Sequence, residues 1–229
     1  MTKDVSRSLS PVKYKCSVTK KLFYFETYLP TPNLPVQHRR ENLEFAIGGE
    51  KDSKILCLIS TSPKYHQTRA VHVAATWARH CSRAVFLTSE ADASLADSYV
   101  NSEARGYYNL WEKISKAFLW VYDENLLSSY EWVLKVDDDT FVFVENLISS
   151  LKPYDPNHLI AAGHKLYTWE TNEVYLNGGA GYVLSKAAVA RLVTKGLRNN
   201  ICEKNLKMGS GEDVNMALCL TYIGMITNN

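Results

Sequence analysis

From residue 54 onward, short apolar runs alternate with longer segments of helical periodicity. The first run, Ile55–Ser60, is nearly continuous in apolar character and predicts a strand buried on both faces of a parallel sheet. Residues 67–80 follow and predict a helix. The apolar face expected for that helix comprises Val71, Ala74, Ala75 and Ala78. The domain is therefore expected to open with a strand, a loop and a helix.

The same alternation continues along the chain. Residues 84–87, 130–136 and 182–184 predict further strands, and 159–162 is another short apolar segment. Residues 109–125 carry apolar side chains at a period near 3.6 and predict the clearest helix, whereas 89–106 predicts a loop or a weak helix. Two more helices are expected, one from Ser185 and one over Glu212–Tyr222. This order predicts an α/β fold: a mostly parallel sheet with helices on both faces and ligands at the carboxyl ends of the strands.

The first 53 residues differ from the remainder. They contain prolines and two basic pairs and show little periodicity, so we expect residues 1–53 to form an extended arm whose apolar stretch, 22–25, packs on the main body. Residues 54–229 are expected to form one α/β domain.

Composition limits the classes of function. The chain has 229 residues, 46% hydrophobic and 22% charged, with a formal net charge of +2. These values exclude global disorder and a nucleic-acid binder that acts mainly through positive charge. The apolar runs are far shorter than the roughly 18 to 20 residues that cross a bilayer. No membrane span and no signal peptide are expected within the chain.

Three consecutive carboxylates, Asp137, Asp138 and Asp139, close the strand predicted at 130–136. In an extended segment Asp137 and Asp139 point to one face and Asp138 to the other. Two convergent carboxylates are suited to Mg²⁺ or Mn²⁺, whose remaining ligands are commonly water and substrate phosphates. The pattern therefore predicts a metal site for a nucleotide-bearing substrate. The alternative is a solvated turn, or a helix cap formed through Asp139 or Thr140.

Two further segments are candidates for a ligand site. Residues 177–181, Asn-Gly-Gly-Ala-Gly, have little side-chain bulk and allow close approach of a ligand, although a tight turn is the alternative. They match neither the dinucleotide-binding nor the P-loop glycine pattern. Glu212 and Asp213 follow Ser210 at the start of an apolar helix. Either acid could act as a general base, or this segment could simply cap the helix; both interpretations stay open.

The cysteines and histidines indicate no further chemistry. Five cysteines stand without a CxxC pair or zinc-finger spacing, so a structural zinc site is not expected. Their number fits buried free thiols slightly better than disulfides. The six histidines have no carboxylate or hydroxyl partner visible in the sequence, and no nucleophile motif supports covalent catalysis.

In order and spacing, the motifs resemble those of the Fringe-type β-1,3-glycosyltransferases, and most closely the core 1 β-1,3-galactosyltransferases that act on O-linked N-acetylgalactosamine. The similarity runs from about Ile55 to Leu220. The segments that carry it are Ile-Leu-Cys at 55–57, Ala-Thr-Trp-Ala at 75–78, Asn-Leu-Trp at 109–111 with Lys113, Trp-Val-Leu-Lys-Val-Asp-Asp-Asp-Thr at 132–140, Gly-Gly-Ala-Gly-Tyr-Val-Leu-Ser at 178–185 and Glu-Asp-Val at 212–214.

This resemblance implies a GT-A fold and the lumenal domain of a type II Golgi membrane enzyme. It also implies a manganese cofactor, UDP-galactose as donor, and a glycoprotein or glycopeptide bearing N-acetylgalactosamine as acceptor; a homodimer is among the assemblies it allows. Asp213 would be the catalytic base, with Glu212 as the nearby alternative, and Asp137 and Asp139 would hold the metal. The other residues it implies are, for the nucleotide sugar, Asp137, Asp138, Asn109, Lys113, Tyr108 and Thr61, and for the acceptor side, Gly179, Ala180, Tyr182 and Trp169.

The resemblance also implies disulfides, pairing Cys57 with Cys81 and Cys202 with Cys219, and leaves Cys16 over. Two departures from the family pattern favour an alternative function. Tyr107 and Tyr108 replace an Arg-Asp pair, and the late segment that supplies a histidine metal ligand does not follow the last helix before the chain ends. A catalytically inactive relative that acts as a chaperone or binding partner of a glycosyltransferase is therefore the alternative. A metal-dependent nucleotidyl or phosphoryl transferase is a third reading, without a matching phosphate loop.

Overall fold

The computed structural model describes residues 54–103, 109–168, 174–207 and 211–225. The predicted arm, 1–53, lies outside the described residues and stays a prediction.

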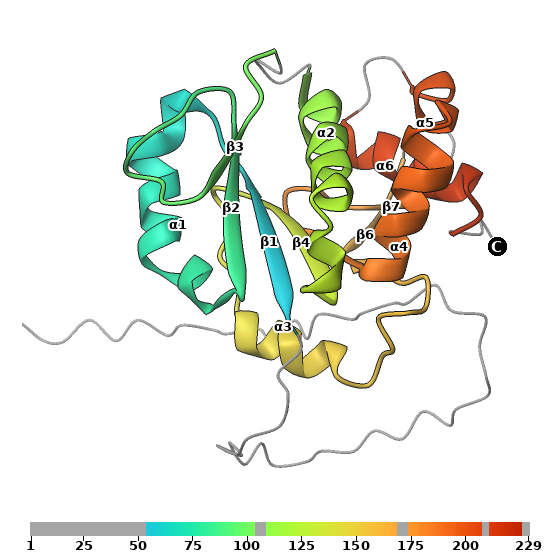
Figure 1. The fold of residues 1–229 in the computed structure, drawn as a ribbon, viewed down its shortest axis with the longest axis horizontal. Coiled ribbons are helices and arrows are strands. Elements are labelled where there is room, and N and C mark those ends of the chain that lie inside the picture. The colour runs from blue at the N-terminus through green and yellow to red at the C-terminus, as the bar shows by residue number, and fades with distance from the viewer. Residues whose placement is uncertain (1–53, 104–108, 169–173, 208–210, 226–229) are drawn as a thin grey trace, which may run out of the picture.

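A six-stranded sheet forms the centre of the molecule (Figure 1). Its order is β3-β2-β1-β4-β8-β5; β1 pairs in parallel with β2 and β4, β2 with β3, and β8 is antiparallel to both neighbours. The strands are β1 (Ile55–Ser60), β2 (Arg83–Thr88), β3 (Ser98–Val100), β4 (Trp132–Asp137), β5 (Ala161–Gly163) and β8 (Tyr182–Ser185), while β6 (Lys165–Tyr167) and β7 (Val174–Leu176) form a separate antiparallel pair. The mostly parallel α/β sheet expected for a GT-A fold is confirmed.

Helices cover both faces of the sheet, with α1 on one side and α2, α4 and α6 on the other (Figure 1). The α-helices are α1 (Val71–Ala75), α2 (Leu110–Asp123), α3 (Val144–Leu151), α4 (Lys186–Arg191), α5 (Ile201–Lys204) and α6 (Glu212–Tyr222). Short 3-10 or π segments occupy Pro63–Tyr65, His66–Ala70, Trp77–His80, Leu126–Ser128 and Leu192–Leu197. Helix α6 has the predicted bounds, and Ser185 caps α4 by accepting the Ala188 N–H.

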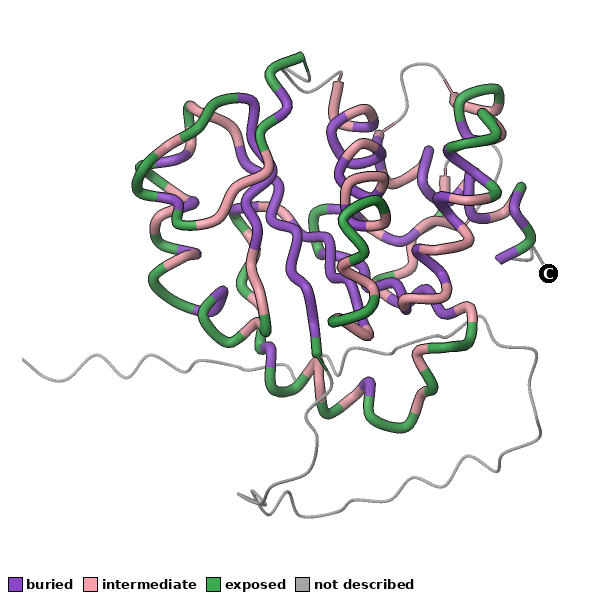
Figure 2. The backbone as a smooth tube through the Cα atoms, viewed as in Figure 1, coloured by how far each residue is buried: buried purple, intermediate pink, exposed green. Residues whose placement is uncertain are grey.

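The central strands divide the core into two layers. Along β1, Leu56 and Leu58 face the layer that contains α2, whereas Ile55, Cys57 and Ile59 face the layer with α1 and α3. Strand β1 is buried over its whole length (Figure 2). An apolar run without polar alternation is what a strand covered on both faces requires. The interpretation of 55–60 as a central strand is confirmed.

The helix predicted over 67–80 is wrong as a single helix. The segment consists of three short helical pieces, and the backbone breaks at Thr76, where φ is −115° and ψ is −109°. Its buried face is formed by Ala70, Val73, Trp77 and Ala78, while Ala75 is exposed. The small alanine side chains gain little from burial, whereas the large Trp77 side chain gains much and is 3% exposed. Trp77 therefore decides which face of the segment packs on the sheet.

The loop or weak helix expected at 89–106 is also corrected. Its described part contains β3, which pairs with β2 in parallel. Backbone hydrogen bonds extend this pairing from Phe86 N–H to the Asp97 carbonyl and from Asn101 N–H to the Thr88 carbonyl. A three-residue edge strand is stabilised by its neighbour and leaves little periodicity in the sequence.

Both implied disulfides are confirmed. Cys57 on β1 pairs with Cys81, which follows Trp77–His80, and Cys202 on α5 pairs with Cys219 on α6. The reading of these four residues as free thiols is therefore wrong. Cys57 and Cys81 lie in the core layer with α1, and Cys202 and Cys219 lie in the layer with α2. The number of cysteines could not indicate which of them are neighbours in the fold.

Candidate active site

One edge of the sheet collects the predicted site residues. The parallel strands β1, β2 and β4 end at this edge with Thr61, Thr88 and the carboxylates from Asp137 onward. Strand β8 runs the opposite way, so it begins here, directly after the glycine segment 178–181. The amino end of α6 brings Glu212 and Asp213 to the same place, as their contacts with that segment show.

A buried lysine lies at the centre of this edge. Lys135, on β4, is 1% exposed, and its Nζ donates to Asp137 Oδ1 at 2.9 Å and to the Gly178 carbonyl at 3.2 Å. It also forms an ion pair with Glu212 Oε2 at 3.1 Å, and Tyr182 donates to Glu212 Oε1 at 2.6 Å. Burial disfavours the charge of Lys135, but the carboxylates of Glu212 and Asp137 raise its pKa above the ordinary lysine value. Burial raises the pKa of Glu212, against the opposing effect of Lys135.

The other two acids of the triplet share an arginine. Arg69 Nη1 contacts Asp138 Oδ1 at 3.3 Å and Asp139 Oδ2 at 2.9 Å, and its guanidinium lies 4.0 Å from the centroid of the Tyr65 ring. Asp138 is buried, and burial raises its pKa although hydrogen bonds from Thr61 and Arg69 favour the carboxylate. The triplet is therefore divided: Asp137 has a buried lysine partner, whereas Asp138 and Asp139 share a half-exposed arginine.

Thr61 connects the end of β1 to two candidate residues. Its hydroxyl donates to Asp138 Oδ2 at 2.7 Å, and its carbonyl accepts a 2.7 Å hydrogen bond from Lys113 Nζ. Lys113 comes from α2 and is 7% exposed; burial lowers its pKa, against the charges of Asp137 and Asp138. Asn109 stands at the start of the same helix. The structure thus brings Thr61, Lys113 and Asp138 together, and their binding of a nucleotide sugar stays a prediction.

The glycine segment contacts the acid pair through its backbone. The Gly178 N–H donates to Asp213 Oδ2 at 2.9 Å, and the Gly179 carbonyl accepts a 2.5 Å hydrogen bond from the Thr140 hydroxyl. Gly181 has a φ of +89°, which favours glycine. The segment is therefore a turn, as the alternative reading held, and it also joins the acid triplet to α6. Of the two acids on α6, Glu212 is buried and Asp213 is partly accessible.

The predicted metal ligands, Asp137 and Asp139, do not lie in an extended segment, because the chain turns after β4 and the Thr140 N–H bonds the Asp137 carbonyl. That part of the expectation is wrong, and the two carboxylates contact different cations, Lys135 and Arg69. The side chains of Asp137 and Asp139 are 31% and 56% exposed, and each has a second oxygen besides the one that contacts a cation. Among the described residues, no group of three or more His, Cys, Asp or Glu side chains could hold a metal. Mg²⁺ and Mn²⁺ often use one or two carboxylates and complete the shell with water and phosphate. Two carboxylates suit that arrangement, and their binding of a metal stays a prediction.

Several predicted residues lie elsewhere or outside the described part of the chain. Tyr182 is 1% exposed and supports Glu212, so in this conformation it presents no surface to an acceptor, whereas Gly179 and Ala180 are exposed. Tyr108, Trp169 and Ser210 lie outside the described residues, and their roles stay predictions.

Sequence reasoning missed three residues. Lys135 was included in the apolar strand, although a lysine in a strand buried on both faces was itself a signal of a charged partner. Arg69 lay in a helix interpreted only by its apolar face. His66, predicted to have no partner, is 3% exposed; its Nδ1 lies 3.1 Å from Asp92 and its Nε2 lies 2.7 Å from the Thr88 hydroxyl. No local signal could have found those partners, which are 22 and 26 residues away.

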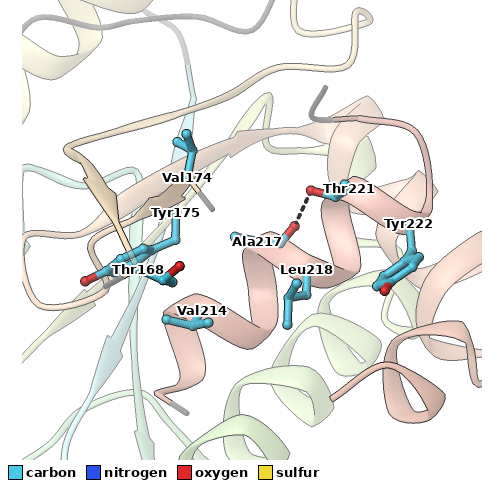
Figure 3. A pocket seen from close by; sticks show the side chains of 8 residues that line it. All are labelled: Thr168, Val174, Tyr175, Val214, Ala217, Leu218, Thr221 and Tyr222. Carbon is cyan, nitrogen blue, oxygen red and sulfur yellow. Dashed lines mark hydrogen bonds between the residues drawn. The ribbon is translucent and has the colours of Figure 1, made fainter. Parts of the chain in front are cut away.

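A pocket of about 140 Å³ runs along α6 from Val214 to Tyr222 (Figure 3). Residues of α6 line one side and residues at or near β6 and β7 line the other: Thr168, Val174, Tyr175, Val214, Ala217, Leu218, Thr221 and Tyr222. Val214 directly follows Asp213, and burial, with the charge of Asp213, raises the pKa of Tyr175. The pocket therefore adjoins the base candidate, while the acid triplet is not part of its lining.

Comparison with known proteins gives consistent matches. A family model described as Fringe-like matches residues 50–227. A Xenopus laevis protein named Glycoprotein-N-acetylgalactosamine 3-beta-galactosyltransferase 1 is 32% identical over 201 residues, covering 88% of this chain and 54% of that protein. A Mus musculus protein named Beta-1,3-glucosyltransferase is 26% identical over 205 residues, covering 88% of this chain and 37% of that protein. The chain thus spans about half the length of the first relative and less of the second.

The comparisons do not support a homodimer, and we do not propose one. Within the part of the chain that the structure describes, no helix combines the length and apolar character needed to cross a membrane.

Proposed function

Since the chain belongs to the Fringe-like family, we propose that it is an inverting, UDP-sugar-dependent β-1,3-glycosyltransferase that transfers galactose from UDP-galactose to O-linked N-acetylgalactosamine of glycoproteins. The printed names of the two relatives support a β-linked hexosyl transfer, and the more similar of the two supports galactose and this acceptor. One observation carries the proposal: a partly accessible carboxylate, Asp213, stands at the amino end of α6, linked to the acid triplet after β4 through Gly178 and Lys135.

On the donor side, Asp137 and Asp139 would hold Mn²⁺. When bound, this ion would neutralise charge on the diphosphate that leaves with uridine. Lys113 and Thr61 join the end of β1 to α2 and would form the wall of the nucleotide pocket, with Asn109 at the start of that helix. Because Thr61 also holds Asp138, this wall and the acid triplet keep a fixed relation.

On the acceptor side, Asp213 would act as the general base. The acceptor hydroxyl oxygen attacks the anomeric carbon, the bond from that carbon to the diphosphate oxygen breaks, and the hydroxyl proton passes to the Asp213 carboxylate. A single in-line displacement inverts the anomeric centre and requires no nucleophilic side chain. Glu212 is assigned a supporting role because it is buried and bonded to Tyr182 and Lys135, whereas Asp213 is partly accessible. Gly179 and Ala180 are exposed beside it and would face the acceptor.

The two disulfides suit an oxidising compartment, which supports the proposal of a Golgi lumenal enzyme.

The test measures UDP release from a panel of UDP-sugars with an N-acetylgalactosamine peptide, with and without Mn²⁺. We expect metal-dependent release that is fastest with UDP-galactose. Asp213→Asn should lower kcat by at least about 10²-fold while it keeps the affinity for UDP, because only the base is lost. If the full-length protein binds UDP but transfers no sugar, the enzyme proposal fails and the chaperone alternative replaces it.

A further inference from the structure

Lys135 uses its whole hydrogen-bonding capacity at the site. An ammonium group has three N–H donors. In this structure the three acceptors around it are Asp137 Oδ1 at 2.9 Å, Glu212 Oε2 at 3.1 Å and the Gly178 carbonyl at 3.2 Å. The Tyr182 ring lies against the same ammonium, with its centroid 5.8 Å away. Each acceptor belongs to a different segment, so one side chain connects three parts of the site that are far apart in the sequence.

The three segments are packed too closely to move independently. A methyl group at Gly178 would lie 3.1 Å from Asp213 Cβ, 3.1 Å from Glu212 Oε2 and 3.2 Å from Lys135 Nζ. The same glycine donates its N–H to Asp213 and offers its carbonyl to Lys135. A displacement of Lys135 is therefore transmitted to Asp213 by two routes, through the backbone of Gly178 and through Glu212, which precedes Asp213 on α6.

Burial restrains the ion pair between Lys135 and Glu212. The side chains of Lys135 and Glu212 are each 1% exposed, and a buried charge that loses its partner is strongly unfavourable. By contrast, Asp213 is partly accessible and is held from the loop by the Gly178 N–H. The partly accessible Asp213 carboxylate thus depends for its position on buried groups.

Resting on the proposed function, the geometry points to Lys135 as a positioning residue that holds the Asp213 base in register with Asp137 on the donor side, through Glu212 and the Gly178 carbonyl. It touches neither substrate nor metal in this role. Its effect is to fix the relation between the carboxylate that takes the acceptor proton and the carboxylate on the nucleotide side.

Two variants separate positioning from stability. Lys135→Met with Glu212→Met replaces the buried ion pair by apolar side chains, a change that often preserves stability. Glu212→Gln keeps the size of the side chain and leaves the Lys135–Asp137 contact in place. The control is Lys116→Met with Glu103→Met, which makes the same substitutions at an exposed ion pair between α2 and the segment that precedes it.

Three measurements are made on each variant: kcat with UDP-galactose and the glycopeptide, affinity for UDP with Mn²⁺, and hydrogen exchange of the Gly178 amide by NMR. We expect both site variants to lower kcat on the order of 10²-fold, the usual consequence of a base misplaced by about 1 Å. Glu212→Gln should keep the affinity for UDP, and the Gly178 amide should exchange faster in both site variants. The control pair should change none of these.

A folded Lys135→Met, Glu212→Met protein with wild-type kcat, or with wild-type exchange at Gly178, would overturn the positioning role. If the wild-type protein transfers no sugar, the proposed function fails, while amide exchange still decides whether Lys135 holds the base in place.

Discussion

The Thr61 hydroxyl donates a 2.7 Å hydrogen bond to Asp138 Oδ2 across 77 residues of sequence. This bond joins the ends of β1 and β4, which are paired in parallel from Ile55 to Ser60. It also supplies a partner for a carboxylate that is only 7% exposed. The middle acid of the triplet therefore has a structural role that its neighbours do not share.

Thr61→Val should remove this bond with little change of shape. We expect the free energy of unfolding to fall by about 1.5–3 kcal/mol, because a hydrogen bond to a buried charged group is lost. Urea unfolding followed by circular dichroism measures the change. Thr221→Val is the matched control, since that hydroxyl bonds only the Ala217 carbonyl of its own helix, and it should change stability by less than about 0.5 kcal/mol. Equal losses in the free energy of unfolding would show that the Thr61–Asp138 hydrogen bond contributes no more to stability than the hydroxyl–carbonyl bond within α6.

Asp139→Ala tests the metal role. Its carboxylate is 56% exposed and contacts Arg69, an ion pair expected to contribute no more than about 1 kcal/mol to stability. The melting temperature should therefore stay close to that of the wild type, while Mn²⁺-dependent UDP binding, measured by calorimetry, should be lost. Glu124→Ala, at the exposed end of α2, controls for the removal of one surface carboxylate. Unchanged UDP affinity in Asp139→Ala would remove this residue from the metal site.

The Cys57–Cys81 disulfide closes a loop with a sequence separation of 24. Replacing both cysteines by alanine should lower the free energy of unfolding by about 3 kcal/mol, because the unfolded chain gains conformational freedom. The Cys202–Cys219 pair, with a separation of 17, should give a similar loss. Urea midpoints with and without reductant measure both effects. A wild-type midpoint that reductant does not move would contradict this expectation.

Acid pH should weaken the hydrogen bonds that Asp92 accepts. Hydrogen bonds from Ser94, and then from Gln67 and His66, lower the pKa of Asp92 from 3.8 to about 2. A lowered carboxyl pKa gives a stabilisation that is complete above the unfolded value and is lost as the pH falls toward about 2. The difference in melting temperature between the wild type and Asp92→Asn should therefore be largest near neutral pH and shrink below pH 4. Glu124→Gln controls for the loss of one surface charge. A difference that does not vary with pH would mean that Asp92 has no such role.

The apolar pattern alone located four strands of the central sheet: β1, β2, β4 and β8. Ile55–Ser60 has the predicted bounds because a strand covered on both faces is a continuous apolar run, and Glu212–Tyr222 because an acidic pair marks the start of an apolar helix. The triplet at 137–139 and the acid pair at 212–213 were also found from sequence, since adjacent charges after buried segments are conspicuous. Weak signals failed: alanines did not indicate the buried face of 67–80, and the edge strand Ser98–Val100 depends on its neighbour for its conformation.

The tertiary structure decided which charges meet. Lys135 lies two residues from Asp137 in sequence but also pairs with Glu212, and Arg69 contacts Asp138 and Asp139 from 69 and 70 residues away. Such pairings follow from strand order and from the direction of β8, which brings the glycine turn to the same edge as the acids. Sequence periodicity reports which face of an element is apolar. Which charged groups become neighbours depends on how the elements are packed, because burial requires a partner without specifying where in the chain that partner lies.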